Sequence, residues 1–171
     1  MVIFYDAIKV QTVKEFYKNV TEEVRDLPED GSEKVDVYFS TPGGLKYLVP
    51  VIYGVLNKYE SKINLILTNE MCSSGFDLLY MLRKKEIWMG PEFTLSMTHK
   101  GSMRVDIQNE AVLNLATAYT EKDFVEWQRR YKKLGLTKQE LKDLSSGADV
   151  YFDRERTLQL FPNIKEINYY E

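Results

Sequence analysis

Short apolar runs alternate with helix-forming segments through the first half of this chain, and the alternation restricts the folds open to it. Extended segments are predicted at Val2–Tyr5, Val35–Phe39, Ile63–Leu67, Glu86–Met89 and Phe93–Thr98. Helices are predicted between them, from an N-cap at Thr12 to about Arg25, from Gly44 to about Tyr59, and over Ser73–Leu82. Strands that alternate with helices form largely parallel sheets through right-handed crossovers. The predicted fold class is therefore α/β with repeated β-α units.

The second half is predicted to be mainly helical. Its expected elements are a long helix over Asp106–Leu134 stopped by Gly135, a helix capped by Thr137 and running to Leu144, an extended Val150–Phe152, and a last helix to Leu160. Charged residues are dense between Glu121 and Lys133, and we interpret that stretch, with Trp127 and Tyr131, as the solvated face of the long helix.

Composition narrows the class of protein. A chain of 171 residues has room for one domain with a substantial core. A formal charge of −3 without a basic stripe argues against nucleic-acid binding. The longest apolar stretch, Tyr47–Leu56, is too short to span a membrane, and the N-terminal residues do not resemble a signal peptide. A single cysteine and a single histidine leave little for a disulfide or a zinc site, so we expect a reducing, cytoplasmic setting.

Three polar motifs follow successive predicted strands. Thr41-Pro42-Gly43-Gly44 comes after the second, Cys72-Ser73-Ser74-Gly75 after the third, and His99 after the fifth. Alone, each has an ordinary explanation: a tight turn, helix N-caps, and a structural or solvated histidine. In parallel sheets, however, ligands gather at the carboxyl ends of strands. Together the motifs predict a site for attack on a carbonyl group.

Each motif has a distinct chemical role in such a site. In such a site a serine at the start of the helix, Ser73 or Ser74, is the expected nucleophile, and His99, the only histidine of the chain, is its expected general base. The backbone N–H groups of Gly44 and Ser74 are the expected oxyanion donors. Cys72 is expected to fill a small buried space behind the serine. The acid that would orient His99 is open between Asp149 and Asp143.

These motifs resemble those of the proteolytic subunit of the Clp protease, in the ClpP/crotonase superfamily, and are most similar to the divergent members of phages and large viruses. Thr41-Pro42-Gly43-Gly44 is similar to the family's Ser-Pro-Gly-Gly. Asn69 to Gly75 is similar to its Gly-x-Ala-Ala-Ser-Met-Gly, and the following Leu78-Leu79 sets the register that selects Ser73 as the nucleophile. Met97-Thr98-His99 is similar to its Met-x-His.

The resemblance also bears on the third acid. The segment from Asp149 to Glu155 resembles that of divergent members and implies Asp149, whereas alignment to the standard subunit puts Leu144 or Ser145 at the acid position, beside Asp143. This chain departs from the family pattern at Asn69, Glu70 and Asp77.

What the resemblance implies is a single ClpP-like peptidase domain over residues 1–171 with a ClpP/crotonase-like fold. It implies a Ser73–His99–Asp149 triad, an oxyanion hole at Gly44 and Ser74, and no metal or cofactor. It also implies a homo-oligomeric ring, with the long helix as the oligomerisation element and Tyr47–Leu56 packing within the ring. The usual partner is an AAA+ unfoldase, but the first strand lies so near the N-terminus that we expect cleavage of peptides or loosely folded proteins without one.

Two other functions use the same residues. In the first, the chain is an inactive ClpP-like scaffold, with Asn69, Glu70 and Asp77 marking a decayed site. In the second, it is a crotonase-type acyl-thioester enzyme, which shares the two-amide oxyanion hole. Coenzyme A binding would separate the second from a peptidase.

Overall fold

The computed structural model describes residues 1–100 and 125–167. These residues belong to two compact units, Met1–Thr98 with Tyr151–Glu171, and His99–Val150. The division into compact units does not test whether residues 1–171 form a single domain, which stays a prediction. The predicted helix over Asp106–Leu134 lies outside the described residues up to position 124.

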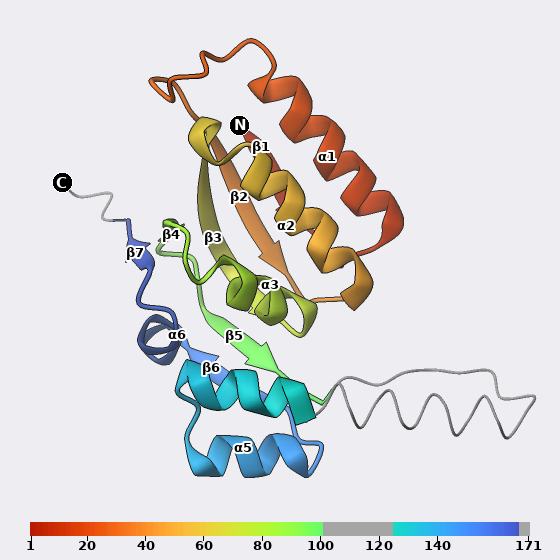
Figure 1. Ribbon diagram of the computed structural model, residues 1–171, viewed down its shortest axis with the longest axis vertical. Helices are drawn as coiled ribbons and strands as arrows, with labels where there is room; N and C mark the ends of the chain where they lie inside the picture. Colours follow the sequence, from red (N-terminus) through yellow and green to blue (C-terminus); the bar gives the residue numbers. More distant parts are fainter. Residues whose placement is uncertain (101–124, 168–171) are drawn as a thin grey trace, which may run out of the picture. The chain divides into compact units, whose positions relative to one another are not determined.

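The first unit is built on a parallel sheet (Figure 1). Its strands are β1 (Val2–Tyr5), β2 (Val35–Thr41), β3 (Ile63–Cys72), β4 (Ile87–Met89), β5 (Leu95–Thr98), β6 (Val150–Asp153) and β7 (Ile164–Glu166). The main path runs β1-β2-β3-β4-β7, each neighbouring pair parallel, while β5 pairs with β3 and β6. The predicted α/β class with a largely parallel sheet is confirmed.

Three helices pack side by side on this sheet (Figure 1). They are α1 (Val10–Val24), α2 (Val49–Lys58) and α3 (Ser74–Leu82), and the unit also contains the short 3-10 helices η1 (Lys46–Leu48) and η2 (Glu60–Lys62) and the helix α6 (Arg154–Leu160). The Thr12 cap prediction is wrong: the N-cap is Lys9, and Thr12 sits three residues into the capping box, where its hydroxyl accepts from the Lys9 N–H at 3.0 Å.

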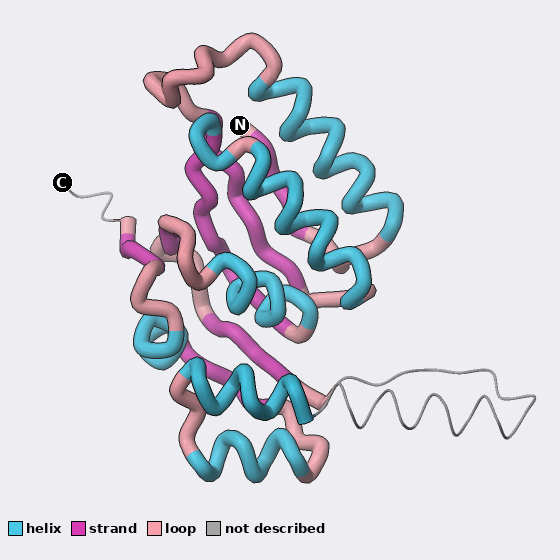
Figure 2. The backbone as a smooth tube through the Cα atoms, viewed as in Figure 1, coloured by secondary structure: helices cyan, strands magenta, loops and turns pink. Residues whose placement is uncertain are grey.

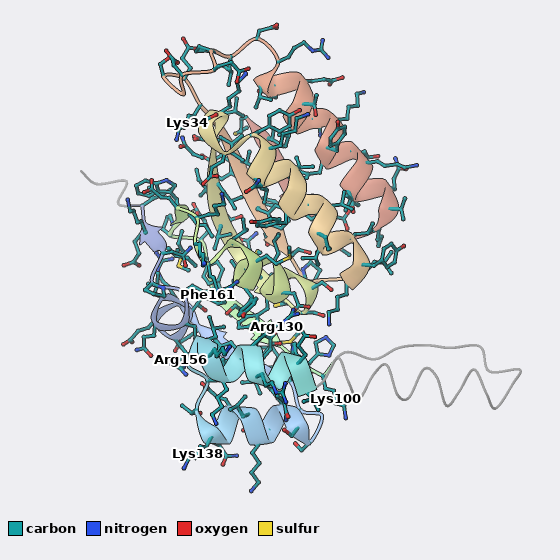
Figure 3. The ribbon with its side chains drawn as sticks, in the orientation of Figure 1. Lys34, Lys100, Arg130, Lys138, Arg156 and Phe161 are labelled. Carbon is teal, nitrogen blue, oxygen red and sulfur yellow. The ribbon has the colours of Figure 1, made fainter. Side chains whose placement is uncertain are left out.

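Aromatic clusters fill the core of the first unit. The Phe4 ring stacks on Phe39 at 4.6 Å between centroids, and Phe16 meets both edge-on. Phe76 of α3 lies 5.3 Å from Phe152 and 5.3 Å from Phe161, which Figure 3 labels. These contacts fix the start of α3 relative to the strands, and α3 follows directly on Ser73.

The second unit contains helical residues 125–134 and α5 (Lys138–Ser145), with Arg130 on the first and Lys138 at the start of the second (Figure 3). The predicted stop at Gly135 and cap at Thr137 are confirmed: Gly135 has φ +102°, and the Thr137 hydroxyl accepts from the Glu140 N–H at 3.1 Å. The interpretation of Trp127 and Tyr131 as solvated is wrong. Both side chains are buried. Their ring centroids lie 4.4 Å apart, because residues four positions apart share one face of a helix.

Candidate active site

Ser73 occupies the sharp turn between β3 and α3 in a backbone conformation that non-glycine residues rarely adopt. Its φ is +52° and its ψ is −114°. Its N–H donates to the Met97 carbonyl of β5 at 2.7 Å, and its own carbonyl accepts from Phe76 at 2.9 Å. A conformation of this kind costs about 1–3 kcal/mol and persists only where surrounding bonds impose it. A serine on a strained strand-to-helix turn is the arrangement that presents a nucleophile above a sheet.

The Gly43-Gly44 loop is wedged against this turn. β2 ends at Thr41, and Gly43 and Gly44 follow with φ of +103° and +142°. A Cβ added to Gly43 would lie 2.6 Å from the Ser73 Cβ, and one added to Gly44 would overlap the Ile8 carbonyl. Glycine is therefore required at both positions, by conformation and by space.

Two backbone N–H groups at the glycine loop and the start of α3 have no acceptor among the described residues. The Gly43 N–H is used, because it donates to the Thr41 hydroxyl at 3.0 Å. The Ser74 hydroxyl donates to the Gly44 carbonyl at 2.8 Å. Bonds among the described residues leave the N–H groups of Gly44 and Ser74 without an acceptor. Ser74 is the first residue of α3, where a backbone N–H has no helical partner. Gly44 and Ser74 belong to the first unit, as does Ser73. Gly44 follows β2 and Ser74 follows β3, and the carboxyl ends of these two strands lie at the same edge of the sheet (Figure 2).

The neighbours of Ser73 are poorly suited to nucleophilic attack. Ser74 is buried, and its hydroxyl proton is committed to Gly44. Burial raises the pKa of the Cys72 thiol to about 12, with further contributions from its hydrogen bond to the Glu70 carboxylate and from that charge. A thiol with this pKa is protonated at neutral pH and unreactive. The expected packing role of Cys72 is in keeping with its burial.

His99 and Asp149 both lie in the second unit. Nδ1 of His99 is 4.0 Å from Oδ1 of Asp149, beyond hydrogen-bonding distance, and the side chains are 30% and 51% exposed. Asp143 has other partners: its carboxylate accepts from Gln139 at 2.7 Å, and its carbonyl accepts from Ala148 at 3.0 Å. Of the two predicted acids, Asp149 is the one within ion-pair distance of the imidazole.

Among residues 1–100 and 125–167, no cluster of three histidine, cysteine or acidic side chains is arranged to hold a metal ion. In the same residues no helix is both long and apolar enough to cross a membrane.

Comparison with known proteins gives one kind of match. No family model and no curated protein matches the sequence. A solved structure of a ClpP1 mutant from Listeria monocytogenes does match, with a TM-score of 0.70 at 12% identity over 99% of this chain and 91% of that one. The chain has a ClpP-like fold. At this identity the likeness is one of fold, and the ClpP-like backbone is shared without most of its side chains.

One departure from the ClpP-like sequence pattern has a structural reason. Asn69 stands where the family motif begins with glycine, and it has φ +47°. Asparagine is among the few residues that adopt this conformation readily. The Asn69 carbonyl accepts from both the N–H and the hydroxyl of Thr94, each at 2.7 Å. Asn69 thus forms a bend in β3 before the serine without a glycine.

Sequence reasoning missed the two hydroxyls that organise the loop. Thr41 was grouped with a turn, although it ends β2 fully buried, and Ser74 was considered for its N–H and not for its hydroxyl. The available signal was the hydroxyl residue preceding Pro-Gly-Gly.

Proposed function

We propose that this chain is a ClpP-like serine peptidase in which Ser73 is the nucleophile, His99 the general base and Asp149 the acid that orients the imidazole. The observation that carries the proposal is the turn at Ser73. A strained serine lies against Gly43, and the N–H groups of Gly44 and Ser74 have no acceptor among residues 1–100 and 125–167. Strain at a polar residue with unsatisfied donors nearby is typical of a reaction centre.

In this mechanism the Ser73 Oγ attacks the scissile carbonyl carbon while an imidazole nitrogen of His99 takes the hydroxyl proton. Nδ1 of His99 is the nitrogen that faces Asp149, so Nε2 is the one assigned to Ser73. The tetrahedral oxyanion accepts from Gly44 and Ser74, each donor contributing about 2.7–4 kcal/mol to the transition state. The imidazolium then protonates the leaving amine, and water releases the acyl group by the same steps.

The experiment is covalent labelling with a fluorophosphonate probe, read by intact mass. We expect one adduct on the wild type and none on Ser73→Ala or His99→Ala. Ser32→Ala, in an exposed turn, is the matched control and should keep the adduct. Absence of an adduct on the folded, assembled wild type would overturn the proposal.

The third acid is tested in the same assay. Asp149→Asn should slow labelling on the order of 10²-fold to 10⁴-fold, because the imidazole loses the charge that holds its tautomer and stabilises its protonated form. Asp143→Asn should label at the wild-type rate, since Gln139 already occupies that carboxylate. The opposite ranking would transfer the role to Asp143.

A second function is supported by one distance. The separation of 4.0 Å between His99 and Asp149 is longer than an oriented hydrogen bond. An inactive ClpP-like scaffold would have such a separation permanently, whereas catalytic hydrogen bonds of a peptidase often tighten only with substrate. Adduct formation decides between the two.

The proposal includes self-assembly into a ring, a reducing, cytoplasmic setting, and action on peptides or loosely folded proteins without an unfoldase. Apolar surface supports the assembly: Tyr47 and Val51 are 65% and 48% exposed within the segment predicted to pack in the ring. Light scattering on the purified protein reads the assembled mass directly against the 20.1 kDa chain.

A further inference from the structure

We propose that the hydroxyls of Thr41 and Ser74 form a clamp that holds the Gly43-Gly44 loop and so places the Gly44 N–H beside that of Ser74. Both are positioning groups, distinct from the N–H donors themselves. The catalytic consequence of the clamp rests on the proposed function, but its effect on the loop does not.

Thr41 ties the loop to two neighbouring segments. Its side chain is fully buried at the end of β2. Its hydroxyl donates to the Asp6 carbonyl at 2.8 Å and accepts from the Gly43 N–H at 3.0 Å. Its methyl group lies against Gly75, where an added Cβ would come within 2.6 Å of the Thr41 Cγ2. One side chain therefore contacts the segment after β1, the glycine loop and the first turn of α3.

Ser74 fixes the other side of the loop. Its hydroxyl donates to the Gly44 carbonyl at 2.8 Å, which orients the plane of the peptide that follows. The next residue is also held, because the Leu45 N–H donates to the Ile8 carbonyl at 2.8 Å. With Thr41 occupying the Gly43 N–H, three consecutive residues are fixed and only the Gly44 N–H points to no protein acceptor among the described residues.

The clamp makes the donors interdependent. Ser74 supplies one proposed donor from its backbone and orients the peptide next to the other with its side chain. A displacement of about 1 Å in a reacting geometry can cost on the order of 10²-fold in rate. A hydroxyl that keeps Gly44 in register is therefore expected to matter for rate without touching the substrate.

The test measures the loop and the chemistry separately. Hydrogen exchange by mass spectrometry follows the backbone amides of residues 41–48, and phosphonylation of Ser73 by a fluorophosphonate gives a rate. The variants are Thr41→Val, which keeps the shape of the side chain, Thr41→Ser, which keeps the hydroxyl, and Ser74→Ala. Val20→Ala in α1, a core truncation at a fully buried position, is the control for general loss of stability.

We expect Thr41→Val and Ser74→Ala to speed exchange in residues 41–48 and to slow phosphonylation on the order of 10-fold to 100-fold. Thr41→Ser should recover most of the rate. Val20→Ala should leave the phosphonylation rate within about twofold of the wild type, because it does not contact the site, and the faster exchange it causes should not be confined to residues 41–48, because a core truncation lowers the stability of the whole fold. Recovery by serine separates a hydroxyl role from a packing role.

Two results would overturn the clamp. One is a wild-type phosphonylation rate in folded Thr41→Val and Ser74→Ala, which leaves the proposed peptidase intact. The other is unchanged exchange of residues 41–48 in both variants. If the wild type forms no adduct, the peptidase proposal fails instead, and the exchange data alone decide whether the two hydroxyls hold the loop.

Discussion

The amino ends and the carboxyl ends of β2 and β3 differ in pairing register, in backbone conformation and in the polar groups that they bury. At their amino ends the strands pair in regular register, from Val35↔Ile63 onward, beside a small open pocket of about 30 Å³ and the partly exposed ion pair Lys85–Glu60. At their carboxyl ends the register shifts between Phe39 and Thr41, and both positive-φ non-glycine residues of the described chain, Asn69 and Ser73, occur there.

Buried hydroxyls follow the same division. Ser40, Thr41 and Ser74 are all buried at the carboxyl side, and each bonds to a backbone group of a neighbouring segment. At the amino side the described residues include a buried Lys62, whose ammonium group pairs with the exposed Glu29. Backbone strain lowers the stability of the folded state, and so does the burial of a polar group unless that group is hydrogen-bonded. Their concentration at one end marks the part of this sheet shaped by something other than stability.

The largest expected difference between the glycine loop and the rest of the fold comes from a pair of glycine substitutions. Gly43→Ala should destabilise the protein by about 3 kcal/mol or more, because alanine is strained at a positive φ and its Cβ would press on Ser73. Gly54→Ala, in α2 with open space around it, should stabilise by about 0.5–1 kcal/mol. Urea denaturation measures both, and equal effects would erase the distinction between the loop and an ordinary helix.

A pair of buried threonines gives a smaller effect. Thr41→Val should cost about 1–3 kcal/mol, because it leaves the Asp6 carbonyl and the Gly43 N–H unpaired. The hydroxyl of Thr68, also buried, has no hydrogen-bond partner among the described residues. Thr68→Val should therefore stay within about 1 kcal/mol of the wild type or be more stable. Thermal unfolding ranks the two, and a larger loss for Thr68 would contradict this account.

A further effect is confined to alkaline pH and comes from Cys72. Its pKa is raised from about 9 to about 12 in the folded protein. Above pH 9 the thiol ionises in the unfolded chain first, so its stabilising contribution is complete below that pH and is lost toward pH 12. The stability of Cys72→Ala relative to the wild type should therefore rise between these limits, measured by urea denaturation at each pH. A flat difference would show that the thiol is not shielded.

The sequence predicted the positions of most strands and the parallel character of the sheet better than it predicted the lengths of the strands. β2 runs on to Thr41 and β3 to Cys72, because central parallel strands are held by backbone bonds on both sides even where Ser40 or Glu70 interrupts the apolar pattern. β7 was missed, since only its first residue, Ile164, is buried.

The motifs at the site were readable, but the bonds within it were not. Glycine pairs and serines at strand ends point to a loop and a turn, and both are there. Nothing in the spacing says that Thr41 would take the Gly43 N–H and leave that of Gly44, because this depends on atomic positions set by Asp6 and Gly75. The joint action of Ser73, His99 and Asp149 stays a prediction.

The bend at Asn69 also bears on how relatives of this protein can be detected. A positive φ is most often provided by glycine, yet this chain makes the bend with an asparagine whose carbonyl accepts two hydrogen bonds from Thr94. A chain with asparagine at such a position no longer matches a glycine pattern in sequence, although its backbone can adopt the same conformation. Searches for distant proteins of this fold should therefore score asparagine and glycine alike at positions of positive φ, and give backbone conformation more weight than residue identity.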